Sequence, residues 1–196
     1  NADNFSHLAS AIDEDNWFAK YLILNGPETI PNYPMGKQWF DLYPNGIYIA
    51  DAGANEIKIV RESVLSSVKK IELTIKYHLS DLKLKIEDCI VLGFSQGAMM
   101  TFELGVNCNF SFGGLIILSG QIMEKKKIHN QHLLKTPIFI SHGFLDDVLP
   151  ISNFYSSVDY LKKNNYNFES HELKDDTHTI SIKAINLLQK FIKKNI

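Results

Sequence analysis

The sequence predicts an α/β fold in which a mostly parallel sheet is flanked by helices, formed by a single domain of residues 1–196. Three observations predict it. Short apolar runs alternate with longer helical patterns along the chain. The composition, 45% apolar and 21% charged, is typical of a globular protein. No repeat, low-complexity tract or linker rich in proline, glycine or serine interrupts the 196 residues, so one domain is the simplest interpretation.

Short apolar runs mark the predicted strands. Pro137 stands at the entrance of one of them, where a missing amide donor disturbs a sheet least. The predicted strands are Tyr21 to Leu24, Ile47 to Ile49, Cys89 to Leu92, Leu115 to Leu118, Ile138 to Ser141 and Phe168 to Leu173.

Apolar residues at steps of three and four mark the predicted helices. The clearest helix runs from about Asn55 to Leu79. We expect Ser152 to cap a second helix, and a third helix closes the chain. The residues expected to face the core are Ile57, Val60, Val64, Val68, Ile71 and Ile75 in the first helix, Phe154, Val158 and Leu161 in the second, and Ile185, Leu188 and Ile192 in the third.

Charge and cysteine content exclude several classes of function. Twenty basic and twenty-two acidic residues give a net charge of −2, which provides no electrostatic case for binding nucleic acid. Cys89 and Cys108 are the only two cysteines, too few for a disulfide framework or a four-cysteine zinc site. This usage suits a reducing compartment, so we expect a cytoplasmic protein. No apolar stretch approaches the roughly 18 residues of a membrane span, so stable membrane insertion is not expected.

The segment "LGFSQGA" at residues 92 to 98 places one serine between two glycines, where an apolar run gives way to a helical pattern. A serine hydroxyl is a poor nucleophile unless a base and an oxyanion site lie beside it. A sharp strand-to-helix turn can hold such a serine, and it needs small residues two positions before and after. Gly93 and Gly97 meet that need around Ser95. The amide of Gln96 would then point at the developing oxyanion, at the positive end of the helix.

On such a turn the catalytic acid and histidine are expected to follow the serine in that order. One acid pair, Asp146 and Asp147, comes just after the apolar run "PIFI", at the strand end where reactive groups of open α/β sheets gather. The other pair, Asp175 and Asp176, is better interpreted as solvated turn residues close to the histidine.

His178 is the histidine whose position fits a general base. It lies in the loop between the last predicted strand and the last helix. His142 precedes the acids and so breaks the expected order, and His171 lies within a strand, where a structural role is favoured. We therefore expect His178 to take the proton of Ser95 while a carboxylate orients the ring.

Five segments carry a resemblance to a known family. They are "QWFDL" from Gln38, "VLGFSQGAMM" from Val91, "LSG" from Leu118, "TPIFISHGFLDDVLP" from Thr136 and "THTI" from Thr177. Through them the sequence resembles, over nearly its whole length, the phospholipase/carboxylesterase family of α/β-hydrolases, which includes acyl-protein thioesterases and small bacterial carboxylesterases. The resemblance implies the α/β-hydrolase fold.

The resemblance also implies site residues. The family pattern around the acid is H-G-x-x-D-P-x-V-P, and its aspartate falls on Asp146. This sequence departs from the pattern with Asp147 in place of proline and Leu149 in place of valine. The implied roles are Ser95 as nucleophile, His178 as base and the Gln96 amide as one oxyanion donor.

The expected reaction is hydrolysis of a carboxylic ester or thioester through an acyl-enzyme, with no metal or organic cofactor. A short-chain carboxylesterase, a lysophospholipase and an acyl-protein thioesterase share these features, and a non-catalytic binding module is the alternative from another class. The small acyl substrate would lie in a pocket that Trp39, Phe144, Leu145 and Leu149 could line. Monomer and homodimer both remain open.

The family also carries an earlier strand and an H-G-x-G loop, which supplies the second oxyanion donor. Neither occurs in this sequence, which begins at Asn1. We therefore expect a natural protein with roughly 20 to 30 further N-terminal residues, because a sheet without an interior strand leaves backbone groups unpaired. An intact mass equal to 22.3 kDa would contradict this expectation.

Overall fold

A computed structural model describes residues 2–13, 19–31, 33–125 and 130–195. The chain forms two compact units, Asn1–Ile71 and Glu72–Ile196. Whether they act as the one domain that the sequence predicts stays a prediction. Among the described residues, no helix combines the length and the apolar character needed to cross a membrane.

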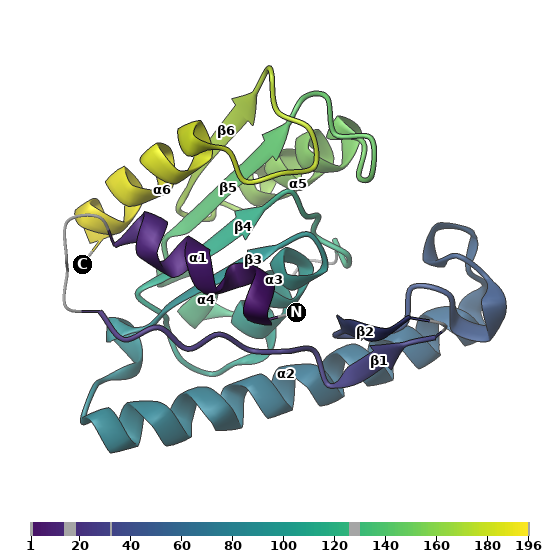
Figure 1. The fold of residues 1–196 in the computed structure, drawn as a ribbon, viewed down its shortest axis with the longest axis horizontal. Helices are drawn as coiled ribbons and strands as arrows, with labels where there is room; N and C mark the ends of the chain where they lie inside the picture. Colours follow the sequence, from purple (N-terminus) through teal and green to yellow (C-terminus); the bar gives the residue numbers. More distant parts are fainter. Residues whose placement is uncertain (1, 14–18, 32, 126–129, 196) are drawn as a thin grey trace. The chain divides into compact units, whose positions relative to one another are not determined.

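The second unit is built on a four-stranded sheet in the order β3-β4-β5-β6 (Figure 1). Its strands are β3 (Ile90–Phe94), β4 (Gly114–Leu118), β5 (Ile138–Gly143) and β6 (Phe168–Leu173). Each strand pairs in parallel with the next. Because all four run the same way, their carboxyl ends meet at one edge of the sheet, and the loops that follow them can share a site.

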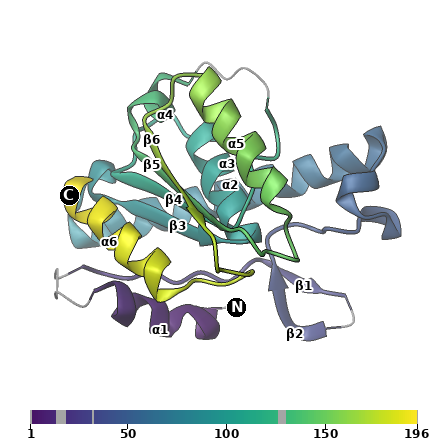
Figure 2. The ribbon, with the colours of Figure 1, turned by 90° about the horizontal axis from the view of Figure 1, so that it is seen from above.

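Helices cover both faces of this sheet. The helices of this unit are α3 (Gln96–Asn107), α4 (Gln131–Lys135), α5 (Ile151–Lys163) and α6 (Ile182–Asn195). Figure 2 shows α3 and α5 on one face and α6 on the other. Phe191 of α6 packs on Phe139 of β5, with ring centroids 5.5 Å apart. Every residue of β4 and β5 is buried, as expected for central strands covered on both sides.

The first unit contains α1 (Ala2–Ile12), an antiparallel pair of strands, β1 (Glu28–Ile30) and β2 (Tyr33–Gln38), and the first part of α2 (Ala54–Leu82). Two serines of α2 hold the strand pair. Ser63 donates a hydrogen bond to Glu28 at 2.7 Å, and Ser67 donates to the backbone oxygen of Trp39 at 2.6 Å. Polar contacts therefore connect β1 and β2 to the helix.

The predicted parallel sheet is confirmed for the four later strands and wrong for the two earlier ones. Residues 21–24 form no regular structure, because no strand among the described residues pairs with them. Residues 47 and 48 join two 3-10 turns, Pro44–Gly46 and Ile49–Asp51, and Ile49 begins the second turn. There the amides of Ile47 and Ile49 donate to Pro44 and Leu42, so local turns use the groups that a sheet would need. The short β1 and β2 are absent from the predicted set.

The three predicted helices are present as α2, α5 and α6, with two corrections in detail. Ser152 is not a cap, since α5 begins at Ile151 after Pro150 at the N-cap position. Proline fixes the backbone there without any side-chain hydrogen bond. Ile57 is 51% exposed although it shares the apolar spacing of the buried α2 residues Val60 and Val64, so the core stripe begins one turn later than predicted.

Candidate active site

Ser95 stands at the turn between β3 and α3, which begins at the next residue. Its backbone has φ 55° and ψ −119°, a conformation that non-glycine residues rarely adopt and that costs about 1–3 kcal/mol. The surrounding hydrogen bonds maintain it. The Ser95 amide donates to Leu118 at 2.9 Å, and the Ser95 carbonyl accepts from Ala98 and Met99 at 3.0 and 3.3 Å. The turn thus holds the serine in a strained position at the carboxyl edge of the sheet.

Gly93 allows this turn to be so tight. A Cβ on Gly93 would lie 2.1 Å from the carbonyl oxygen of Gly97, in the first turn of α3. A clash with backbone at that distance cannot be relieved by moving a side chain, so only glycine lets strand and helix approach this closely. The glycine at position 93 is therefore required because any side chain there would collide with the backbone of Gly97.

Asp146 lies in the turn that follows β5, and its carboxylate is buried. One oxygen, Oδ1, accepts hydrogen bonds from the backbone amides of Val148 and Leu149, at N···O distances of 2.9 and 2.8 Å. Such a short polar side chain stabilises a turn by replacing the missing backbone partner. The other oxygen, Oδ2, lies 2.8 Å from Nδ1 of His178. Asp147 is exposed, so Asp146 is the aspartate of this pair that the structure brings to the histidine.

The surroundings of Asp146 lower its pKa. Burial raises the pKa of this carboxyl, but hydrogen bonds from His178, Leu149 and Val148 and the electrostatic interaction with His178 together have the larger effect. The pKa of Asp146 therefore lies below its ordinary value of 3.8, and the carboxylate is ionised at neutral pH.

The loop that carries His178 crosses the end of β5. Phe144 donates its amide to the Leu173 carbonyl, and Leu145 donates to the Asp176 carbonyl, both at 2.9 Å. A Cβ on Gly143 would lie 2.3 and 2.4 Å from the carbonyl oxygens of Asp176 and Thr177. The absence of a side chain at Gly143 therefore lets the loop approach closely enough for His178 to reach Asp146.

His178 also contacts the residue next to Ser95. Its ring centroid lies 4.8 Å from that of Phe94, with an angle of 44° between the ring planes. The imidazole is thus held between Asp146 on one side and the end of β3 on the other. Its side chain is only 16% exposed. Phe94 was not among the predicted site residues, although its place between Gly93 and Ser95 could have pointed to it.

The other predicted site residues are Gln96, Phe144, Leu145, Leu149 and Trp39, and the structure places them as follows. Gln96 is the first residue of α3, so its amide lies at the helix N-terminus. Phe144 and Leu145 are exposed on the loop beside Asp146, at 47% and 54%, whereas Leu149 is buried and contributes its backbone to the turn. Trp39 belongs to the first unit, where its backbone oxygen accepts from Ser67.

His142 belongs to the site, although the order of residues along the chain argued against it. Its ring is fully buried, and Nε2 lies 2.8 Å from the Leu149 carbonyl oxygen and 3.2 Å from Oδ2 of Asp146. Chain order selects the base but says nothing about other groups that contact the acid. The "SHG" sequence just before the acid was the available signal.

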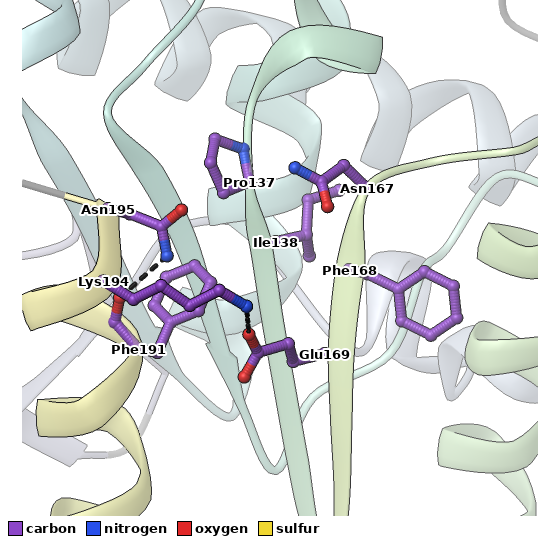
Figure 3. A pocket seen from close by; sticks show the side chains of 8 residues that line it. All are labelled: Pro137, Ile138, Asn167, Phe168, Glu169, Phe191, Lys194 and Asn195. Atoms are coloured by element: carbon purple, nitrogen blue, oxygen red, sulfur yellow. Dashed lines mark hydrogen bonds and ion pairs between the residues drawn. The ribbon is translucent and has the colours of Figure 1, made fainter.

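A hollow of about 240 Å³ opens at the opposite edge of the sheet (Figure 3). Its lining comes from the starts of β5 and β6 and the end of α6, and Lys194 forms an ion pair with Glu169 there. The amino ends of parallel strands lie far from the groups that follow their carboxyl ends, so this hollow is separate from the site around Ser95. Within the described ranges, no group of three or more His, Cys, Asp or Glu side chains is arranged to hold a metal ion.

Gly143→Ala should disrupt the contact between His178 and Asp146. The added methyl group would overlap two backbone oxygens, and such overpacking costs about 1–3 kcal/mol or moves the loop. We expect a lower free energy of unfolding in urea and loss of the low-field proton resonance of the His178 ring N–H. Gly53→Ala is the control, because its Cβ would meet only the movable end of the Glu56 side chain. Equal stability and an unchanged resonance in the two variants would show that the close approach is unimportant.

The lowered pKa of Asp146 predicts a pH dependence of stability. The folded protein binds this proton more weakly than the unfolded chain does, so the ionised carboxylate stabilises the fold above the unfolded pKa. That contribution is lost as the pH falls through the folded pKa. We expect the difference in unfolding free energy between the unsubstituted protein and Asp146→Asn to be constant above about pH 5 and to shrink below about pH 4.

Urea denaturation between about pH 7 and pH 3 measures this difference. Asp147→Asn is the matched control, since that side chain is exposed, and it should change the unfolding free energy at pH 7 by less than about 0.5 kcal/mol. A difference for Asp146→Asn that stayed constant down to pH 3 would rule out the lowered pKa.

Comparisons with known proteins identify the family and the fold. The family model described as phospholipase/carboxylesterase matches residues 5–196. Acyl-protein thioesterase 1 of Saccharomyces cerevisiae is 32% identical over 188 residues, which cover 90% of this chain and 78% of that protein. The crystal structure of Arabidopsis thaliana SOBER1 has a TM-score of 0.80 at 21% identity, covering 99% of this chain and 92% of that one.

The Bacillus cereus carboxylesterase has the same fold, with a TM-score of 0.78 at 16% identity over 100% of this chain and 84% of that one. These structural similarities confirm the predicted α/β-hydrolase fold. Because the family model extends over almost the whole sequence, the chain belongs to the phospholipase/carboxylesterase family and is a hydrolase of ester bonds.

Proposed function

We propose that this hydrolase cleaves its ester or thioester through an acyl-enzyme, with Ser95 as nucleophile, His178 as general base and Asp146 as the residue that orients the base. The observation that carries the proposal is the 2.8 Å contact between His178 Nδ1 and Asp146 Oδ2, formed beside the strained turn of Ser95. Among the described residues, His142 also lies within 3.2 Å of this carboxylate, but its side chain is completely buried, whereas His178 is partly exposed beside Ser95.

The contact with Asp146 determines which nitrogen of His178 reacts. An ionised carboxylate only accepts hydrogen bonds, so Nδ1 carries the proton and Nε2 is the basic nitrogen. Nε2 takes the Ser95 proton as the hydroxyl oxygen attacks the acyl carbon, and Asp146 stabilises the imidazolium that forms. The imidazolium then protonates the leaving alcohol or thiol. In the second half of the reaction, His178 activates a water molecule that attacks the acyl-enzyme ester. This step releases the carboxylic acid and restores Ser95.

The tetrahedral intermediate needs donors for its oxyanion. The Gln96 amide lies at the N-terminus of the twelve-residue helix α3, where the partial positive charge of the helix favours a developing anion. We propose Gln96 as one donor. A second donor would come from another loop, because such sites use at least two.

Ser95→Ala should remove the activity while keeping the fold. Loss of the nucleophile typically lowers turnover by several orders of magnitude, to the small residual rate that binding alone provides. Hydrolysis of p-nitrophenyl esters and labelling by a fluorophosphonate probe measure this directly. His178→Gln should have a similar effect on both. His171→Gln, a change in a histidine of β6 that faces Phe139, is the control and should remain active.

Full hydrolysis by Ser95→Ala would end the proposal. The fluorophosphonate also tests the alternative of a non-catalytic binding module, because an unactivated serine hydroxyl should not react with it. The unsubstituted chain must therefore be labelled at Ser95.

The names of the relatives and the exposed apolar residues beside Asp146 bear on the substrate class. The name of the Saccharomyces cerevisiae relative favours a thioester of an acylated protein, whereas the family description equally fits a lysophospholipid or a short-chain ester. We propose that Phe144 and Leu145, exposed beside Asp146, contact the acyl chain, with Leu149 as a further candidate. The substrate would then be the only partner that the site requires. Both cysteines are free thiols, which supports a cytoplasmic location.

Phe144→Ser and Leu145→Ser should lower kcat/KM more for long acyl chains than for acetyl esters. Each methylene that loses an apolar contact costs up to about 0.8 kcal/mol, so we expect a loss of about tenfold for an octanoyl ester and less than about twofold for an acetyl ester. A series of esters and thioesters of graded chain length measures this. Leu134→Ser, which changes an exposed leucine of α4, is the control. Equal losses at every chain length would exclude these residues from the acyl site.

A further inference from the structure

His142 is a second imidazole in contact with the Asp146 carboxylate. It lies on β5 one residue before Gly143, and its side chain is completely buried. Its Nε2 lies 2.8 Å from the backbone oxygen of Leu149 and 3.2 Å from Oδ2 of Asp146. Oδ2 is also the oxygen that contacts His178. Two histidines from different parts of the chain therefore converge on one carboxylate oxygen.

The partners of His142 determine its tautomer. A carbonyl oxygen and an ionised carboxylate can only accept, so Nε2 must be the nitrogen that carries the proton. The opposite nitrogen, Nδ1, is buried and has no hydrogen-bond partner among the described residues. His142 therefore provides one N–H, shared between the Leu149 carbonyl and the Asp146 carboxylate.

This N–H lies beside the groups that bond Asp146. The Val148 and Leu149 amides donate to Oδ1, and His178 donates to Oδ2. These three hydrogen bonds favour the charged form of the carboxylate. Nε2 of His142 lies 3.2 Å from the same Oδ2, so the carboxylate cannot rotate without breaking these bonds or moving against the buried His142 ring.

We propose that His142 is a positioning residue for the catalytic pair: it fixes the direction of Asp146 Oδ2 and limits how much of its negative charge acts on His178. By also bonding Leu149, it closes the turn that carries Asp146 back onto β5. His142 acts through Asp146 and does not touch the substrate. This inference rests on the proposed function, since it needs Asp146 and His178 to be the catalytic pair.

Three substitutions separate this role from general packing. His142→Leu fills the space without a donor. His142→Gln carries an amide N–H at nearly the position of Nε2, whereas the shorter His142→Asn cannot reach Asp146 Oδ2. His171→Leu is the matched control. His171 lies on the adjacent strand, and its ring packs against Phe139, whereas the ring of His142 contacts the Asp146 carboxylate.

We expect His142→Leu and His142→Asn to lower kcat by about tenfold to a hundredfold with KM nearly unchanged, because a small displacement of a catalytic group can cost about a hundredfold in rate. His142→Gln should retain activity within about threefold, since it keeps the N–H donor, and His171→Leu should match the unsubstituted enzyme. In proton NMR, the low-field resonance of the His178 ring N–H should move in His142→Leu and return toward its original position in His142→Gln.

If His142→Leu does not fold, as judged by circular dichroism, the comparison of His142→Gln with His142→Asn provides the same test. Equal activity in Gln and Asn variants, or an unmoved His178 resonance in a folded Leu or Asn variant, would overturn the inference. Ser95→Ala is measured in the same assay. Retained activity there refutes the proposed function itself, whereas lost activity there with fully active His142 variants refutes only the positioning role.

Discussion

The site depends on the hydrogen bonds that the Asp146 carboxylate accepts. This carboxylate lies in a turn at the end of a buried strand and accepts two amides of that turn, which makes its position a property of the fold. The same carboxylate holds His178 from a loop 32 residues later. Burial alone would favour a neutral acid, but the surrounding donors keep the charge, so one group both organises the turn and holds the His178 ring.

The parallel sheet makes this meeting possible. Strands β3, β5 and β6 end at one edge, and the residues after them are Ser95, Asp146 and His178. Small residues let the segments approach: Gly93 admits the first turn of α3, and Gly143 admits the loop before His178. The backbone strain at Ser95 is maintained by one hydrogen bond to Leu118 of β4 and two from the first turn of α3, so the stable sheet and helix support an unfavourable backbone conformation.

Much of this could be predicted from local patterns. The four later strands and the helices α2, α5 and α6 follow from apolar spacing, and the turn around Ser95, with the helix that begins after it, follows from its two glycines. The strand predictions failed where strand formation depends on a pairing partner elsewhere in the chain. Residues 21–24 are apolar enough for a strand but have no partner among the described residues, and Ile47 to Ile49 lie in turns whose amides bond locally. Ile57 has the helical spacing of a core residue, but about half of it is exposed to solvent.

By itself the sequence determined the order of chemical groups along the chain: a serine on a tight turn, an acid after an apolar strand and a histidine before the last helix. Spacing alone left Asp146 and Asp147 open and the family resemblance implied Asp146; the tertiary structure shows that Asp146 meets His178 and, beyond any prediction, that His142 joins them. The reason is physical. Local spacing encodes which residues are buried, whereas contacts between side chains far apart in sequence depend on strand register and on how closely loops cross, which no short stretch of sequence contains.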